Sequence, residues 1–99
     1  MDAVEFEDKG SGNFLVKGCL TFATVGAALE AGEKLFAGHP HIELDLSGVD
    51  GTDSAGLALL VEWIGWARRE KHHLKFRHIP KQVFALAHIS EVDTLLPVA

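Results

Sequence analysis

The stretch DLSGVDGTDSAGLALLVEWIGWARR (residues 45–69) decides the fold, because a strand pattern gives way there to a helix pattern across a polar turn. Just before and within it, Leu44 and Leu46 alternate with acidic residues, which predicts a strand with one buried face. After the turn, the apolar residues recur at helical spacing. We expect Asp53 or Ser54 to cap this helix, since a side-chain oxygen can accept a bond from a free N–H of the first turn.

The same two patterns recur through the rest of the chain. Alternation predicts strands around residues 3–7, 13–18, 41–47 and 73–79, and helical spacing predicts helices over residues 24–37, 54–70 and 80–89. Strands with one wet face indicate helices packed mainly on one side of a small mixed sheet of four to five strands. We therefore predict a two-layer α/β fold in a single domain, residues 1–99. The segment TLLPV (94–98) could add a turn or an edge strand.

The helix over residues 54–70 carries two apolar stripes. The stripe expected to cover the sheet comprises Leu57, Leu60, Val61, Ile64 and Ala67. The second stripe comprises Leu59, Trp63 and Trp66. One sheet face can bury only one of these stripes, so the second must pack against another helix, bind another protein or remain exposed to solvent. We expect Leu59 and Trp66 to be exposed, and the spacing leaves open whether another helix covers Trp63. An exposed stripe that contains tryptophan is typical of a partner-binding surface.

The polar turn holds more polar residues than a helix cap requires. A cap accounts for one of Thr52, Asp53 and Ser54, and small Ala55 and Gly56 follow. Glycine inside a helix costs about 1 kcal/mol relative to alanine, so we expect the small residues to leave room for another chain. A hydroxyl at a helix N-terminus is also well placed to carry phosphate, which makes Ser54 a candidate phosphorylation site.

Composition and motifs argue against several functional classes. The net charge is −5, which disfavours a nucleic-acid binder, and the basic residues from Arg68 to Lys81 are expected to be a solvated face. The P-loop pattern, the G-x-S-x-G pattern and metal-ligand spacings are absent, so we expect no enzyme activity, cofactor or metal. The single cysteine, Cys19, fits a reducing compartment. No N-terminal stretch has a basic start followed by a long apolar run, and no apolar run is long enough to span a bilayer, so we expect no signal peptide and a soluble, cytoplasmic protein.

Two short segments carry a family resemblance. DLSGV (45–49) at a strand and DSAGL (53–57) at the start of a helix resemble the D-L-S-x-V and D-S-x-G-L segments of the STAS domain family, which includes the anti-sigma factor antagonists. The resemblance covers nearly the whole chain, including HIPKQVFALAHISEVDTLL (78–96). Within the family, GLALLVEW (56–63), with the ARR and PKQVFALA segments that follow, looks most like the MlaB-like members. Those members are small cytoplasmic subunits of the Mla phospholipid-transport ABC complex of Gram-negative bacteria.

This resemblance implies a function as an accessory subunit. The chain would bind the MlaF-like ATPase subunit of an ABC transporter, and through it the membrane permease, with Ser54 at the contact. It would then lie at the inner membrane and support lipid asymmetry of the outer membrane. The expected partner-binding residues are Thr52, Asp53, Ser54, Ala55, Gly56, Leu59, Trp63 and Trp66.

Two other functions stay open. The chain could be an anti-sigma factor antagonist that is switched by phosphorylation of Ser54. Antagonists of that kind usually carry an apolar residue where this sequence has Thr52, which favours the transporter subunit. A more distant alternative is a module that binds a small ligand or a nucleotide.

Overall fold

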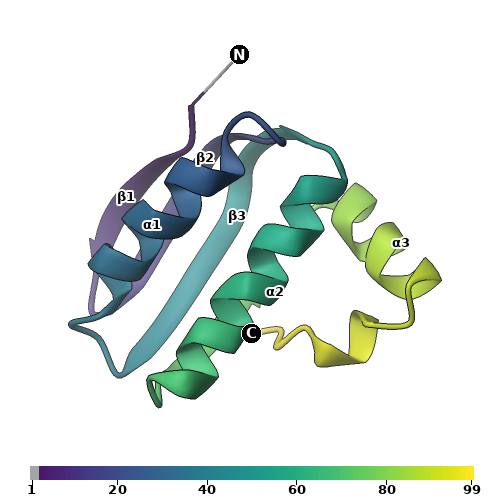
Figure 1. Cartoon of the computed structure of the whole chain (residues 1–99). Helices are drawn as coiled ribbons and strands as arrows, with labels where there is room; N and C mark the ends of the chain where they lie inside the picture. Colours follow the sequence, from purple (N-terminus) through teal and green to yellow (C-terminus); the bar gives the residue numbers. More distant parts are fainter. Residues whose placement is uncertain (1–2) are drawn as a thin grey trace.

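A computed structural model describes residues 3–99 and contains a four-stranded mixed sheet (Figure 1). The strands β1 (Glu5–Gly10), β2 (Asn13–Leu20), β3 (His41–Thr52) and β4 (His73–Arg77) lie in the order β1-β2-β3-β4. β1 is antiparallel to β2, whereas β3 is parallel to both of its neighbours. The helices are α1 (Val25–Phe36), α2 (Ser54–Arg69) and α3 (Lys81–Ile89), and a short 3₁₀ helix, η1 (Asp93–Leu95), follows. The predicted order of elements is confirmed.

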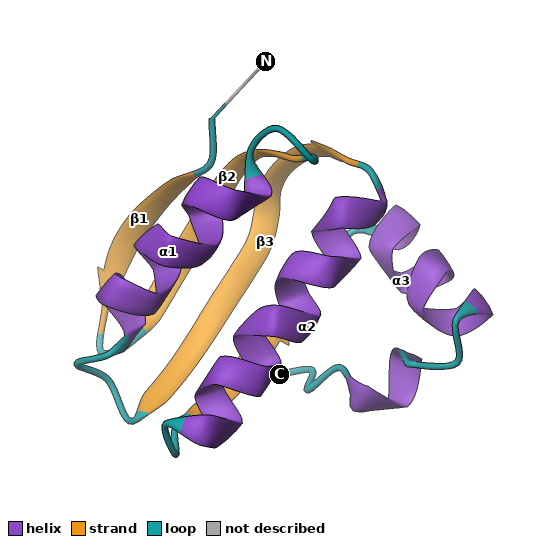
Figure 2. Ribbon diagram, in the orientation of Figure 1, coloured by secondary structure: helices purple, strands orange, loops and turns teal. Residues whose placement is uncertain are grey.

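The helices form a second layer over one face of the sheet. Figure 2 shows α1 and α2 on the same side of the strands, and α2 lies between α1 and α3. The strand residues that point toward this layer are the apolar members of the alternating pattern, which removes their side chains from water. They include Phe14, Val16, Leu20, Ile42, Leu44, Leu46, Leu74 and Phe76, all buried. The predicted two-layer arrangement is therefore confirmed.

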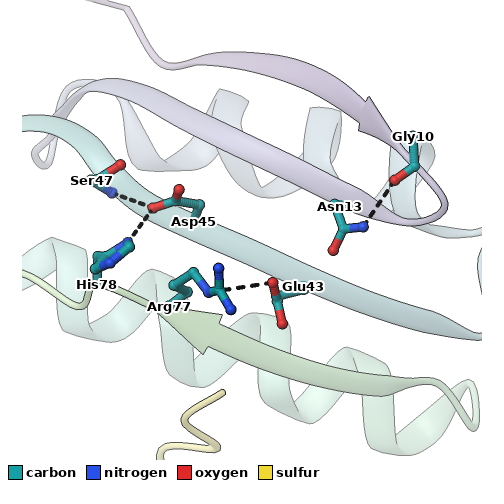
Figure 3. A network of polar contacts seen from close by, with 7 residues as sticks. All are labelled: Gly10, Asn13, Glu43, Asp45, Ser47, Arg77 and His78. Carbon is teal, nitrogen blue, oxygen red and sulfur yellow. Dashed lines mark hydrogen bonds and ion pairs between the residues drawn. The ribbon is translucent and has the colours of Figure 1, made fainter.

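The face of β3 and β4 that no helix covers carries paired charges (Figure 3). Arg77 Nε lies 3.5 Å from a carboxylate oxygen of Glu43. Asp45 Oδ1 accepts the backbone N–H of Ser47 at 2.9 Å and lies 2.9 Å from His78 Nδ1. Partial burial raises the pKa of the Asp45 carboxyl, but the bonds from His78 and Ser47 outweigh burial and hold that pKa below its usual range. Two of the basic residues that follow α2 thus pair with acidic residues of β3.

The C-terminal segment forms both structures that the sequence left open. A turn of 3₁₀ helix comes first, and Val98 then pairs with Phe76 in a single parallel bridge. The N–H of Phe76 donates to the carbonyl of Pro97 at 2.7 Å, and the N–H of Ala99 donates to the carbonyl of Phe76 at 2.8 Å. Leu96 is buried between these two features. The segment therefore covers part of the outer edge of β4.

Helix α2 buries residues of both apolar stripes, which differs from the expectation. Leu59, Trp63 and Trp66 are 2%, 0% and 9% exposed, so the expectation that Leu59 and Trp66 are exposed is wrong. Val61, expected in the core, is 41% exposed. The cause is that α1 lies beside α2 and gives it a second surface to pack against. Helix α2 therefore buries the side chains that face α1 as well as those that face the sheet.

Gly32 of α1 makes this second contact possible. A Cβ atom at this position would lie 2.9 Å from the indole of Trp63 and 3.0 Å from Phe36, so the missing side chain leaves room for the tryptophan. The rings of Phe36 and Trp63 meet edge to face with centroids 5.5 Å apart. Trp66 also stacks on the imidazole of His72, with centroids 4.7 Å apart. Both tryptophans thus belong to the core.

Candidate partner-binding site

The turn between β3 and α2 is built around the carboxylate of Asp53. β3 ends at Thr52, α2 begins at Ser54, and Asp53 between them is the N-cap. Its Oδ1 accepts the backbone N–H of Ala55 at 2.8 Å. Its own N–H donates to the carbonyl of Leu20 at the end of β2, at 3.0 Å. Of the two residues predicted as the N-cap, Asp53 is the cap and Ser54 is the first residue of the helix.

Ser54 is exposed at the first position of α2. Within residues 3–99 its hydroxyl makes no hydrogen bond, while the hydroxyl of Thr52 donates to the carbonyl of Asp53 at 2.9 Å. A hydroxyl that is both exposed and without a partner can donate to and accept from a second molecule. The structure thus leaves the Ser54 hydroxyl accessible to another protein.

Ala55 and Gly56 are small for a reason internal to the chain. Both are buried, and a Cβ atom at Gly56 would overlap the Thr52 hydroxyl and lie 3.3 Å from Leu20. The side chain of Thr52 and the end of β2 therefore occupy the space that Gly56 leaves. The expectation that Ala55 and Gly56 make room for another chain is corrected, because this chain itself fills the room.

The accessible apolar groups near Ser54 are different from those expected. Leu59, Trp63 and Trp66 are buried and are not available on the surface. Ala58 and Val61 are exposed, and the helical spacing of 100° per residue places them on the same face of α2 as Ser54. Helical spacing predicts Val61 in the core, but this spacing carries no information on the second helix, α1, beside which α2 packs.

Phe22 was missed at the sequence level. It lies in the loop between β2 and α1 and is 77% exposed, and its N–H donates to Oδ2 of Asp53 at 3.3 Å. This bond places the loop beside the first turn of α2. The available signal was an aromatic residue in the short turn TFAT (21–24), where polar and small residues are usual. We call Phe22, Ser54, Ala58 and Val61 the Ser54 surface.

A hollow of about 220 Å³ next to the loop of Phe22 is lined by residues that include Ala23, Thr24 and Ala27. A shallow hollow of about 510 Å³ is lined by residues that include Lys17, Gly18, Gly48 and Asp50, on the uncovered side of the sheet. Among residues 3–99, no three His, Cys, Asp or Glu side chains gather closely enough to hold a metal ion. No helix of this part of the chain is long and apolar enough to cross a membrane.

The fold and the turn define a small α/β domain of the kind found in STAS proteins, and comparison with known proteins gives the family. The model of the family described as "Mlab, STAS domain" matches residues 8–97. The chain therefore belongs to the STAS domain family. No curated protein matches the sequence.

Solved structures share the fold at low sequence identity. The phosphorylated form of SpoIIAA, a Bacillus cell fate determinant, has a TM-score of 0.68 and 12% identity, and the match covers 98% of this chain and 91% of SpoIIAA. The unphosphorylated anti-sigma factor antagonist SpoIIAA gives a TM-score of 0.65 at 12% identity, covering 97% of this chain and 86% of that one. The murine anion transporter Slc26a9 gives 0.61 at 21% identity.

The lengths of these proteins differ widely. The match to Slc26a9 covers 85% of this chain but 14% of the transporter. A protein named Mglu matches at a TM-score of 0.61 and 24% identity, over 81% of this chain and 20% of that protein. The fold therefore occurs both as nearly a whole protein and as a small part of a larger one.

Proposed function

We propose that this chain is a non-enzymatic accessory subunit that binds the ATPase subunit of an ABC-type phospholipid transporter of the Mla kind. The observation that carries this proposal is the Ser54 surface, where the exposed residues Phe22 and Val61 accompany a hydroxyl that makes no hydrogen bond within residues 3–99. Exposed apolar groups next to one polar group are typical of a protein contact. The family model's description as Mlab supports the choice of an ABC transporter as the partner.

The test is a titration of the purified chain against the MlaF-like ATPase subunit of the same host. Val61→Glu should abolish measurable binding, because it places a charge in a contact from which water is excluded. Leu35→Glu is the matched control, since Leu35 is an apolar residue on α1 with nearly the same exposure, 42% against 41%. Loss of binding in both variants, or in neither, would contradict the assignment of the contact to the Ser54 surface.

Substitutions of Ser54 test the polar centre of the contact. Ser54→Glu should weaken binding about tenfold or more, because its carboxylate would lie next to that of Asp53 in a desolvated contact. Ser54→Ala should weaken it about two- to tenfold if the hydroxyl makes a buried hydrogen bond to the partner. Wild-type affinity in both variants would remove Ser54 from the interface. In the same assays the isolated chain should hydrolyse no ATP.

A second candidate function is that of an anti-sigma factor antagonist. The position of Ser54 favours it, because an exposed hydroxyl at a helix N-terminus can be reached by a kinase and its phosphate would meet the positive end of the helix dipole. Capture of an anti-sigma kinase instead of an ABC ATPase from the native host, with phosphate transfer to Ser54, would establish this function in place of the first.

A further inference from the structure

The loop that carries Phe22 is held in one conformation by hydrogen bonds. The hydroxyl of Thr24 accepts the N–H of Thr21 at 2.9 Å and donates to the carbonyl of Cys19 at 2.7 Å. The N–H of Thr24 in turn donates to the carbonyl of Thr21 at 2.9 Å. Phe22 is therefore an apolar ring, 77% exposed, on a tight loop. An aromatic side chain has few rotatable bonds, so on a loop whose backbone is already ordered it loses little conformational freedom on binding, which makes it an efficient contact residue.

Asp53 joins this loop to α2 through both oxygens of its carboxylate. Oδ1 accepts the N–H of Ala55 at 2.8 Å, and Oδ2 accepts the N–H of Phe22 at 3.3 Å. The bond to Phe22 joins residues that are 31 positions apart in the sequence. Hydrogen bonds to a charged acceptor are stronger than those between neutral groups, so one side chain fixes the loop against the helix.

A helix cap alone does not require this arrangement. One side-chain oxygen is sufficient for an N-cap, and Asn, Ser and Thr serve there about as well as Asp. The second oxygen of Asp53 is not needed to cap α2, and it accepts the N–H of Phe22 in the loop between β2 and α1. The carboxylate therefore has a role that the other capping residues cannot fill.

We infer that Asp53 is the positioning residue of the Ser54 surface: it holds Phe22 and Ser54 in one fixed arrangement, so that a partner engages both together. This inference rests on the proposed function for the identity of the partner. The chemistry that fits is an ATPase surface with an apolar pocket for the phenyl ring, next to a polar group that bonds the Ser54 hydroxyl. Asp53 acts through Phe22 and does not itself need to touch the partner.

The first test uses the isolated chain and the variant Asp53→Asn. The amide oxygen keeps one hydrogen bond, and we expect it to stay on Ala55, where the bond is shorter. The amide N–H₂ then faces the N–H of Phe22, and that bond is lost. Amide hydrogen exchange at Phe22, followed by NMR, should accelerate about fivefold or more, as expected for a lost bond to a charged acceptor. Unchanged exchange at Phe22 overturns the inference.

A matched control separates the bond from the charge. Asp50→Asn removes the same negative charge from an exposed residue of β3, a few residues before Asp53. Exchange at Phe22 should keep the wild-type rate in this variant. Equal acceleration in both variants would mean that net charge, and not the Asp53 bond, controls the loop, which overturns the inference.

The second test is a double-mutant cycle against the purified MlaF-like ATPase subunit. Phe22→Ala should weaken binding about tenfold or more, and Asp53→Asn about fivefold. The double variant should bind as Phe22→Ala does, because Asp53 acts only through the ring that this variant lacks. Equal effects of Asp53→Asn with and without Phe22, or no effect of Phe22→Ala, overturn the inference. If the wild-type chain does not bind the ATPase, the proposed function fails, while the exchange measurement still decides the role of Asp53.

Discussion

Trp63 and Trp66 carry the main difference between the expected and the observed surface. Both indoles lie inside the molecule, where they contact the ring of Phe36 on α1 and, for Trp66, also the imidazole of His72 that follows α2. The residue that replaces them on the surface, Val61, is a small aliphatic side chain. A large aromatic residue on a helix is therefore no guide to a partner surface when a second helix lies alongside.

Trp66→Ala should lower the free energy of unfolding by about 3–5 kcal/mol, because it opens a cavity between α1, α2 and His72. Val61→Ala should lower it by less than about 1 kcal/mol, since the side chain is largely in water already. Urea unfolding of the two variants in parallel measures both values. If Trp66→Ala unfolds at the wild-type midpoint, the side chain does not contribute to the core as the structure has it.

Helix α1 illustrates how one element determines which face of another is buried. Its buried residues are Ala28, Gly32 and Phe36, which are four positions apart and therefore lie on one face of the helix. The small side chains on this face let α2 approach closely. Two glycines of α1 occupy contrasting environments. A Cβ atom would meet nothing within 4 Å at Gly26, whereas at Gly32 it would lie 2.9 Å from Trp63. The two positions therefore separate helix propensity from packing.

Gly32→Ala should destabilise the protein by about 1–3 kcal/mol, because the crowding of Trp63 outweighs the gain of about 1 kcal/mol in helix propensity. Gly26→Ala is the matched control on the same helix and should stabilise by up to about 1 kcal/mol. Thermal melting of both variants gives the comparison. A higher melting temperature for Gly32→Ala than for the wild type would show that α1 and α2 are not in tight contact at this point.

The sequence was sufficient for most elements but not for the burial of α2. Alternation identified the strands, because each has one covered face, and Asp53 was correctly among the predicted caps. Periodicity gives the angle of each residue around a helix, but it does not say how many neighbours the helix has. Gly32 was the available signal, since glycine in the middle of a helix often marks a close approach. Phe22 could not be placed, because its link to Asp53 joins residues 31 positions apart.

Among residues 3–99, three carboxyl side chains have pKa values below their usual range: Glu7, Asp45 and Asp93. Hydrogen bonds from Lys9 and Lys17 lower the pKa of Glu7, and the bond from His88 lowers that of Asp93. For Asp45, burial raises the pKa, but the hydrogen bonds from His78 and Ser47 together lower it by more than burial raises it. All three groups bind protons more weakly in the folded chain than in the unfolded chain.

The stability that these three groups contribute should therefore be fully present above the unfolded carboxyl pKa of about 4 and be lost as the pH drops through the lower folded values. Asp45→Asn should make this decline shallower, because it removes one of the three groups. Urea unfolding at a series of pH values between neutral and strongly acidic solution measures the slope. The same slope in wild type and Asp45→Asn would mean that the network around Asp45 does not contribute to acid sensitivity.

The central strand β3 also has a consequence for the order in which the chain folds. β1 and β2 are sequence neighbours joined by a tight turn, whereas β3 is parallel to β2 and to β4, with a helix between each pair. The hairpin can form within about 1–10 μs, but β3 can pair only after a long connection has closed. Docking of β3 should therefore limit the refolding rate. In stopped-flow refolding, Leu44→Ala in β3 should slow the folding limb, while Phe6→Ala in β1 should act mainly on the unfolding limb.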